Sequence, residues 1–314
     1  MKAKLSVNIG KLKLKNPVIV ASGTFGYGEE FADFIDLKKL GAIVSKTITL
    51  RPRQGNPPPR TCETPAGMLN SIGLENPGLD AFTECKLPGL AKIGVPVIVS
   101  IASESGVSEF VELARCLDRL REVAAIEINI SCPNIRAASV PASQRPSLVA
   151  QDPKATYEVV KAIRKVTTKT LITKLSPNVT DITEIAIAAE RAGSDAVSLI
   201  NTLTGMSIDI ATRKPRIACV TAGLSGPAIR PIAVRMVWEV YRKVKIPVIG
   251  MGGIMDTASA LEFFLAGATA ISIGTANFIN PRAAAEIIYG LEKFLVKNKV
   301  NNIRQLIGSV KIEN

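Results

Sequence analysis

Short apolar runs, each bounded by residues that favour turns, recur eight times along the chain. These runs cover residues 18–21, 42–45, 97–101, 125–128, 171–174, 196–200, 248–250 and 270–273. Between them lie segments with the apolar period of an amphipathic helix, several opened by a helix-start signal such as Asp152 before Pro153. Alternating strands and helices predict a parallel sheet, and eight such units predict an α/β fold of the closed (β/α)8 TIM-barrel type.

Three connections between the predicted elements are longer than ordinary barrel loops. They cover residues 47–96, 131–152 and 202–227, and each follows a predicted strand. Because the strands of a parallel barrel all end at one face, we expect these loops on the C-terminal face, as a lid or small subdomain. A length of 314 residues suits one barrel, so we predict a single domain over residues 1–314.

Polar or small residues stand where the predicted strands end. They are Ser22, Lys46, Ser100, Asn129, Lys174, Asn201, Gly252, Gly253, Gly274 and Thr275. A lysine that emerges from an apolar strand is costly to bury unless it meets an anion or an electron-rich group. A single such lysine can bury its aliphatic stem and keep its charged end in water, without any ligand. Two lysines on one face, together with two asparagines, predict a binding site.

Two glycine-containing turns, Gly252-Gly253 and Gly274-Thr275, follow the seventh and eighth predicted strands. Barrels bind cofactor phosphates at this place, where glycines let backbone N–H groups and a helix N-terminus approach the oxyanion. The alternative is that both pairs form ordinary tight turns. That explanation suits either pair alone but is weaker for two pairs in adjacent units. The first turn lacks the third glycine of a dinucleotide-binding fingerprint. We therefore predict a mononucleotide phosphate, and FMN is the natural candidate.

A thiol follows the fourth predicted strand, in the segment Asn129-Ile130-Ser131-Cys132-Pro133-Asn134. Pro133 cannot donate to a sheet ladder, so we expect Cys132 on a loop. The alternative is a small buried hydrophobic residue, the usual role of a free Cys, but two flanking asparagines that need partners weigh against it. With a reference pKa of about 8.5, Cys132 is a usable general base where its surroundings favour the thiolate. Proton removal by this thiol and hydride transfer to a flavin, with Lys174 favouring the anionic reduced ring, make a C–C dehydrogenation.

The composition excludes several other classes. The chain contains no His, which excludes Ser-His-Asp hydrolysis. Its five cysteines are scattered, so we expect no zinc or iron–sulfur site in this chain, and free thiols suit a cytoplasmic protein. No signal peptide or membrane span is expected from the sequence. The net charge of +12 is spread over many predicted helix faces, so we interpret it as solvated surface; attraction of an anionic substrate or an acidic partner is the secondary interpretation.

Across nearly its full length the chain resembles the catalytic subunit of class 1B dihydroorotate dehydrogenases. The resemblance rests on residues 21–28, 45–50, 55–60 through 76–78, 129–134, 174–178 and 223–228, and on the two glycine turns. It implies one FMN per chain and oxidation of dihydroorotate to orotate in pyrimidine (UMP) biosynthesis. A Cys base and the absence of an extra amino-terminal helix are typical of class 1.

The resemblance also implies roles for individual residues. Cys132 would take the C5 proton while the C6 hydride passes to flavin N5. The substrate would be held by Lys46, Asn70, Ser71, Ile72, Gly73, Leu74, Asn129, Asn201 and Thr202. The flavin would be lined by Ser22, Lys46, Thr47, Ser100, Asn129, Lys174, Ile200, Gly226, Gly252, Gly253, Gly274 and Thr275. No residue is expected to bind a metal.

By the same resemblance, a partner subunit with FAD and a 2Fe–2S cluster would relay electrons to NAD, in a heterotetramer built on a homodimer. Two departures stand out: Ser100 replaces a common Asn, and residues 135–142 lack the glycine-containing segment of the family. Three alternatives remain open. They are a class 1A-like, fumarate-linked enzyme, a tRNA-modifying dihydrouridine synthase, and a non-catalytic phosphate-binding barrel.

Overall fold

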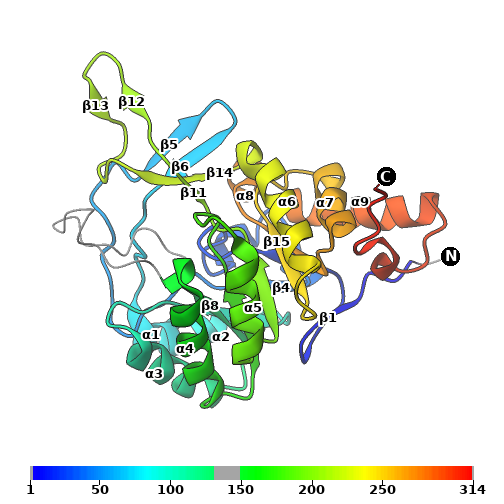
Figure 1. The fold of residues 1–314 in the computed structure, drawn as a ribbon, viewed down its shortest axis with the longest axis horizontal. Coiled ribbons are helices and arrows are strands. Elements are labelled where there is room, and N and C mark those ends of the chain that lie inside the picture. The colour runs from blue at the N-terminus through cyan, green and yellow to red at the C-terminus, as the bar shows by residue number, and fades with distance from the viewer. Residues whose placement is uncertain (1–2, 131–148, 313–314) are drawn as a thin grey trace.

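The structure is a computed structural model that describes residues 3–130 and 149–312. Eight parallel strands close into a barrel, each paired with the next along the chain and the last with the first (Figure 1). They are β3 (Val18–Val20), β4 (Ala42–Val44), β7 (Val97–Ile101), β8 (Val123–Asn129), β9 (Thr170–Lys174), β10 (Ala196–Leu199), β15 (Val248–Met251) and β16 (Ala270–Ile273). The predicted strands and the TIM-barrel fold are confirmed; the prediction of a single domain stays a prediction.

Helices cover the outside of the barrel. The longer ones are α2 (Leu87–Lys92), α3 (Val107–Asp118), α4 (Pro153–Arg164), α5 (Ile182–Ala192), α6 (Arg230–Tyr241), α7 (Thr257–Ala266) and α9 (Ala283–Lys297). The short ones are η1 (Glu29–Phe31), η2 (Leu37–Lys39), α1 (Gly78–Ala81), η3 (Phe82–Lys86), η6 (Val149–Gln151), η7 (Pro227–Ile229), α8 (Ala276–Ile279) and η8 (Ile303–Leu306). Because the helices cover the outer face and side chains fill the inside, the strands are buried on both faces and read as continuous apolar runs.

The helix-start signals of the sequence act as expected. The side chain of Asp152 accepts a hydrogen bond from the backbone N–H of Lys154, and Pro153 occupies the first turn of α4. At α7, Asp256 and Ser259 form a reciprocal capping box. These caps fix where each helix begins, and therefore how the preceding strand end is presented.

The first and third long connections pair with each other over the C-terminal face. Their strands β5 (Thr61–Thr64), β6 (Gly67–Asn70), β11 (Leu203–Gly205) and β14 (Ala222–Ser225) form one sheet in the order β11-β14-β6-β5. A second hairpin, β12 (Ile208–Asp209) with β13 (Lys214–Pro215), extends from this sheet as an arm (Figure 1). The expected subdomain is thus a four-stranded antiparallel sheet. Most of the second connection lies outside the described residues.

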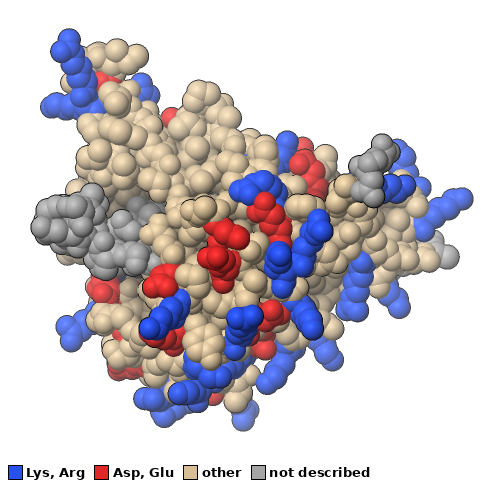
Figure 2. All heavy atoms as spheres, in the orientation of Figure 1, with Lys and Arg blue, Asp and Glu red and all other residues tan. Residues whose placement is uncertain are grey.

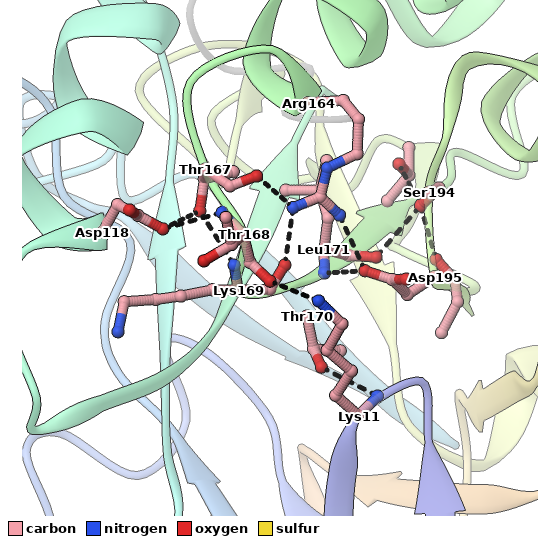
Figure 3. A network of polar contacts seen from close by, with 12 residues as sticks. Lys11, Asp118, Arg164, Thr167, Thr168, Lys169, Thr170, Leu171, Ser194 and Asp195 are labelled. Carbon is pink, nitrogen blue, oxygen red and sulfur yellow. Dashed lines mark hydrogen bonds and ion pairs between the residues drawn. The ribbon is translucent and has the colours of Figure 1, made fainter.

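The amino-terminal end of the barrel is closed by the hairpin of β1 (Val7–Ile9) and β2 (Leu12–Leu14) and by a polar network around the start of β9 (Figure 3). In this network Arg164 Nη1 lies 2.9 Å from Asp195 Oδ2, which also accepts the backbone N–H of Leu171 at 2.8 Å. The Lys169 ammonium donates to the carbonyl oxygens of Leu120 and Val123. Each charged end in this cluster is therefore matched by groups of the protein itself.

Candidate active site

A cavity of about 230 Å³ lies at the carboxyl ends of the barrel strands, beneath the four-stranded sheet. Most of the residues predicted for the site line it: Ser22, Lys46, Thr47, Asn70, Ile72, Gly73, Leu74, Asn129, Lys174, Ile200, Asn201, Thr202, Gly226, Gly252, Gly253, Gly274 and Thr275. Residues from every part of the chain, from Ser22 to Thr275, therefore meet in one place. Cys132 lies outside the described residues.

A chain of hydroxyl groups supports one wall of the cavity. Ser22 Oγ lies 3.0 Å from Thr47 Oγ1, which lies 2.9 Å from Ser100 Oγ and accepts the Asn129 amide at 3.2 Å. Ser100 is fully buried and does not line the cavity. Ser100 therefore ends behind Thr47 and orients it.

Ser71 is the other predicted residue that does not line the cavity. Its side chain is buried, and its hydroxyl accepts a hydrogen bond from Asn56 Nδ2 at 2.9 Å. Its backbone N–H donates to Arg60 O at 2.8 Å. Ser71 therefore holds the two halves of the first connection together, and its neighbours Asn70 and Ile72 face the cavity.

Two lysines give the cavity its positive charge. Lys46 follows β4 and Lys174 ends β9, and both line the cavity. Within the described residues, no side-chain hydrogen bond or ion pair occupies either ammonium group. Lys174 is nearly completely buried, at 6% exposure. Buried ammonium groups are stabilised by an anion or by electron-rich atoms, so an occupant with negative charge suits this site.

Hydrogen bonds with the backbone hold two asparagine side chains of the cavity wall. Asn70 Nδ2 donates to the carbonyl of Gly223 at 3.3 Å, which fixes its side chain on β6 against β14. Asn201 Oδ1 accepts the backbone N–H of Thr202 at 2.8 Å. A side-chain amide can both donate and accept hydrogen bonds, which suits the edge of a planar ring that carries both N–H and C=O groups.

The glycine turns form a cradle that larger residues would fill. Gly252 and Gly253 follow β15 with φ of 120° and 76°, and a Cβ added to Gly253 would lie 2.7 Å from Arg230 Cβ. Beside Gly274 the nearest atoms to such a Cβ lie 3.8 Å away, at ordinary contact distance, and Gly274 lines the cavity. Successive backbone N–H groups in a turn can make an anion-binding concavity. The cradle therefore fits a mononucleotide phosphate, held by backbone amides; α8 is a single turn and adds little.

Several lining residues were missed from the sequence. They are Ala21, Gly23, Thr24, Thr61, Met68, Ser225, Ile229, Met251, Ile254, Met255, Ser272 and Phe278. Met251 and Ser272 point inward on neighbouring strands, and strand alternation could have identified them. Thr61 and Met68 belong to β5 and β6, in a connection that the sequence placed on the C-terminal face without indicating which of its side chains enter the cavity.

A buried carboxylate anchors the start of the first connection. Glu109 of α3 accepts hydrogen bonds from Ser103, Ser105 and the backbone N–H of Leu50. Burial raises the pKa of this carboxyl group, but the hydrogen bonds outweigh burial and hold the pKa below its usual value. Glu109 thus stays charged and fixes the chain a few residues after Lys46 and Thr47.

Charged side chains on the visible face are mixed in sign (Figure 2). Lysine and arginine are interspersed with acidic residues over the outer helices and do not form one basic face. This agrees with the prediction that the positive charge is spread over many helix faces. In the part of the chain that the structure describes, no group of His, Cys, Asp and Glu is suited to hold a metal ion. None of the described helices is long and apolar enough to span a bilayer.

Comparison with known proteins points to one family. The family model described as "Dihydroorotate dehydrogenase" matches residues 4–295. A protein of Geotalea daltonii named "Dihydroorotate dehydrogenase B (NAD(+)), catalytic subunit" is 54% identical over 311 residues, 99% of each chain. Proteins with the same name from Trichlorobacter lovleyi and Caldicellulosiruptor bescii are 55% and 53% identical; the matches cover 99% and 98% of this chain and 99% of each relative.

Proposed function

The chain belongs to the dihydroorotate dehydrogenase family, and from this premise we propose that it oxidises dihydroorotate to orotate in pyrimidine biosynthesis, with one FMN bound at the barrel mouth. The observation that carries the proposal is the convergence of two lysines, three asparagines and the glycine cradle on one cavity. When bound, FMN supplies the hydride acceptor.

The chain's own residues divide the work of binding. The amides of Gly252, Gly253 and Gly274 would hold the phosphate of FMN, together with Thr275, whose hydroxyl donates to Ser225 at 2.8 Å. Lys174 would face the pyrimidine edge of the flavin ring. The hydroxyl chain of Ser22, Thr47 and Ser100 would hold one wall of the flavin site in place.

Substrate recognition uses the remaining polar groups. Lys46 would pair with the carboxylate of dihydroorotate, a charge-assisted contact. Asn70, Asn129 and Asn201 would bind the polar edge of its ring. Cys132, which follows β8 in the sequence by three residues, would remove the C5 proton. This base role rests on the family resemblance and on the position of Cys132 after Asn129.

The electron acceptor involves a second subunit. The name "catalytic subunit" of the relatives implies a separate partner for them. We extend this to the present chain: a subunit with FAD and a 2Fe–2S cluster would pass electrons to NAD, in a heterotetramer built on a homodimer. We also propose a cytoplasmic location, which the free and scattered cysteines favour.

Turnover of two related rings tests the proposed function. With an artificial electron acceptor, the purified chain should convert dihydroorotate to orotate and should leave dihydrouracil, which lacks the carboxylate, essentially unchanged. Equal turnover of both rings would remove the role of Lys46. No turnover of either, in protein that contains FMN, would overturn the proposal. Affinity purification at native expression levels should recover an iron–sulfur flavoprotein if the partner exists.

A further inference from the structure

The barrel interior contains a carboxylate that the proposed function does not use. Glu127 lies on β8, two residues before Asn129, and is 2% exposed. Its Oε2 accepts a hydrogen bond from Ser198 Oγ at 3.0 Å, but its Oε1 is buried without a hydrogen-bond partner among the described residues. A buried carboxylate is costly unless a positive charge or a full set of donors compensates it. Glu127 therefore needs a compensating group that one serine cannot supply.

Strand register places Lys174 next to this carboxylate. Strand β9 lies between β8 and β10, and Glu127 is paired with Ile172 of β9. The bond from Glu127 to Ser198 crosses the inner face of β9, and Ser198 is in turn paired with Lys174. Lys174 stands two residues after Ile172 on the same face, about 7 Å along the strand. The carboxylate thus passes directly below the start of the Lys174 side chain.

Lys174 lies on the strand next to β8, whereas the other lysine of the cavity, Lys46, follows β4, which is separated from β8 by β7. Among the described residues no ion pair joins Glu127 to Lys174, so the two charges interact through space inside the barrel. Because such an interior screens charge weakly, separated groups still stabilise each other. Two lysines and one carboxylate also leave the cavity floor with a single net positive charge.

We propose that Glu127 is the counter-charge of Lys174 and its positioning residue. It compensates the buried ammonium group while the cavity is empty. When flavin is bound, it limits how strongly Lys174 stabilises negative charge on the reduced ring. The second statement rests on the proposed function; the first does not.

A double-mutant cycle tests the charge pair in the full-length chain without bound flavin. We expect Lys174→Met to lower the folding equilibrium constant at least about tenfold in the native background, because it leaves Glu127 uncompensated. In the Glu127→Gln background, Lys174→Met should lower the folding equilibrium constant less than about threefold. If Lys174→Met lowers this constant by the same factor in both backgrounds, the proposal is overturned. If Glu127→Gln alone does not fold, recovery of folding in the double variant supports the pair, and no recovery overturns it.

The flavin midpoint potential tests the second part. Glu127→Gln should make the potential more positive, by about one tenfold step in the two-electron equilibrium, or about 30 mV. The matched control is Asp195→Asn, which removes a carboxylate at the opposite end of the barrel and should leave the potential unchanged. An unchanged potential in Glu127→Gln overturns this part even where the cycle shows coupling. Protein that binds no flavin would instead contradict the proposed function, while the cycle would still report on the pair.

Discussion

The charged side chains at the two ends of strand β9 differ in whether the protein supplies their hydrogen-bond and ion-pair partners. At its start, Arg164 and Asp195 pair with each other, and Asp195 also accepts the backbone N–H of Leu171 (Figure 3). At its end, Lys174 has no protein partner within hydrogen-bonding distance among the described residues. Only three positions along β9 separate Leu171, which belongs to a network that satisfies its own charges, from the buried ammonium group of Lys174. The amino-terminal end of the barrel is arranged for stability, and the carboxyl end keeps binding capacity for a ligand.

The largest effect should come from Cys132, the proposed base, which follows β8 in the sequence. Cys132→Ala should slow reduction of the bound flavin by dihydroorotate at least about a hundredfold, because a positioned general base is worth that much. Stopped-flow reduction under anaerobic conditions measures it, and FMN content should stay at one per chain. The matched control is Cys116→Ala, a half-buried free cysteine of α3, which should behave as wild type. Unchanged kinetics in Cys132→Ala would remove this residue from the role.

Exchanging a lysine at either end should separate binding from stability. Lys46→Met should raise KM for dihydroorotate about 10- to 100-fold, since a charge-assisted hydrogen bond contributes about 1.5–3 kcal/mol. Its free energy of unfolding should change little or rise. Lys169→Met at the amino-terminal end should lower the free energy of unfolding and leave KM for dihydroorotate unchanged, because the Lys169 ammonium donates to the carbonyl oxygens of Leu120 and Val123. A rise in KM for both variants, or a loss of unfolding free energy in both, would contradict the division between the two ends of the barrel.

Removing the carboxylate of the amino-terminal network should affect stability alone. Asp195→Ala should lower the free energy of unfolding by about 1–3 kcal/mol, because the Leu171 N–H and the Arg164 guanidinium lose their partner. Chemical denaturation measures the loss, and kcat and KM should be unaltered. Asp209→Ala, on the exposed arm, serves as the control and should lose much less. A large change in kcat for Asp195→Ala would contradict the division between the two ends.

The smallest effect concerns acid stability at the same end. Burial raises the pKa of Asp118, but hydrogen bonds from Thr167 and Thr168 outweigh burial and hold the pKa below its usual value. A lowered folded-state pKa stabilises the protein above the unfolded-state pKa of about 3.9, and this contribution disappears as pH falls through the folded-state value. Asp118→Asn should therefore flatten the decline in stability below about pH 4. An identical acid profile in wild type and variant would show that Asp118 contributes nothing there.

The sequence predicts the barrel better than it predicts what covers it. Strands buried on both faces leave apolar runs, and caps such as Asp152 and Asp256 mark helix starts, so these elements could be located. The pairing of β6 with β14 joins residues about 150 positions apart and follows no local pattern. The sequence also did not indicate in which direction individual side chains point. Ser71 and Ser100 stand in the expected segments but turn to Asn56 and Thr47, because a buried hydroxyl follows the nearest hydrogen-bond partner.

Anaerobic titration of the purified protein with dihydroorotate tests the central claim most directly. The account predicts yellow protein whose flavin absorbance is lost on addition of dihydroorotate, with one orotate formed per flavin reduced. Protein that carries FMN and keeps its colour with excess dihydroorotate would contradict it.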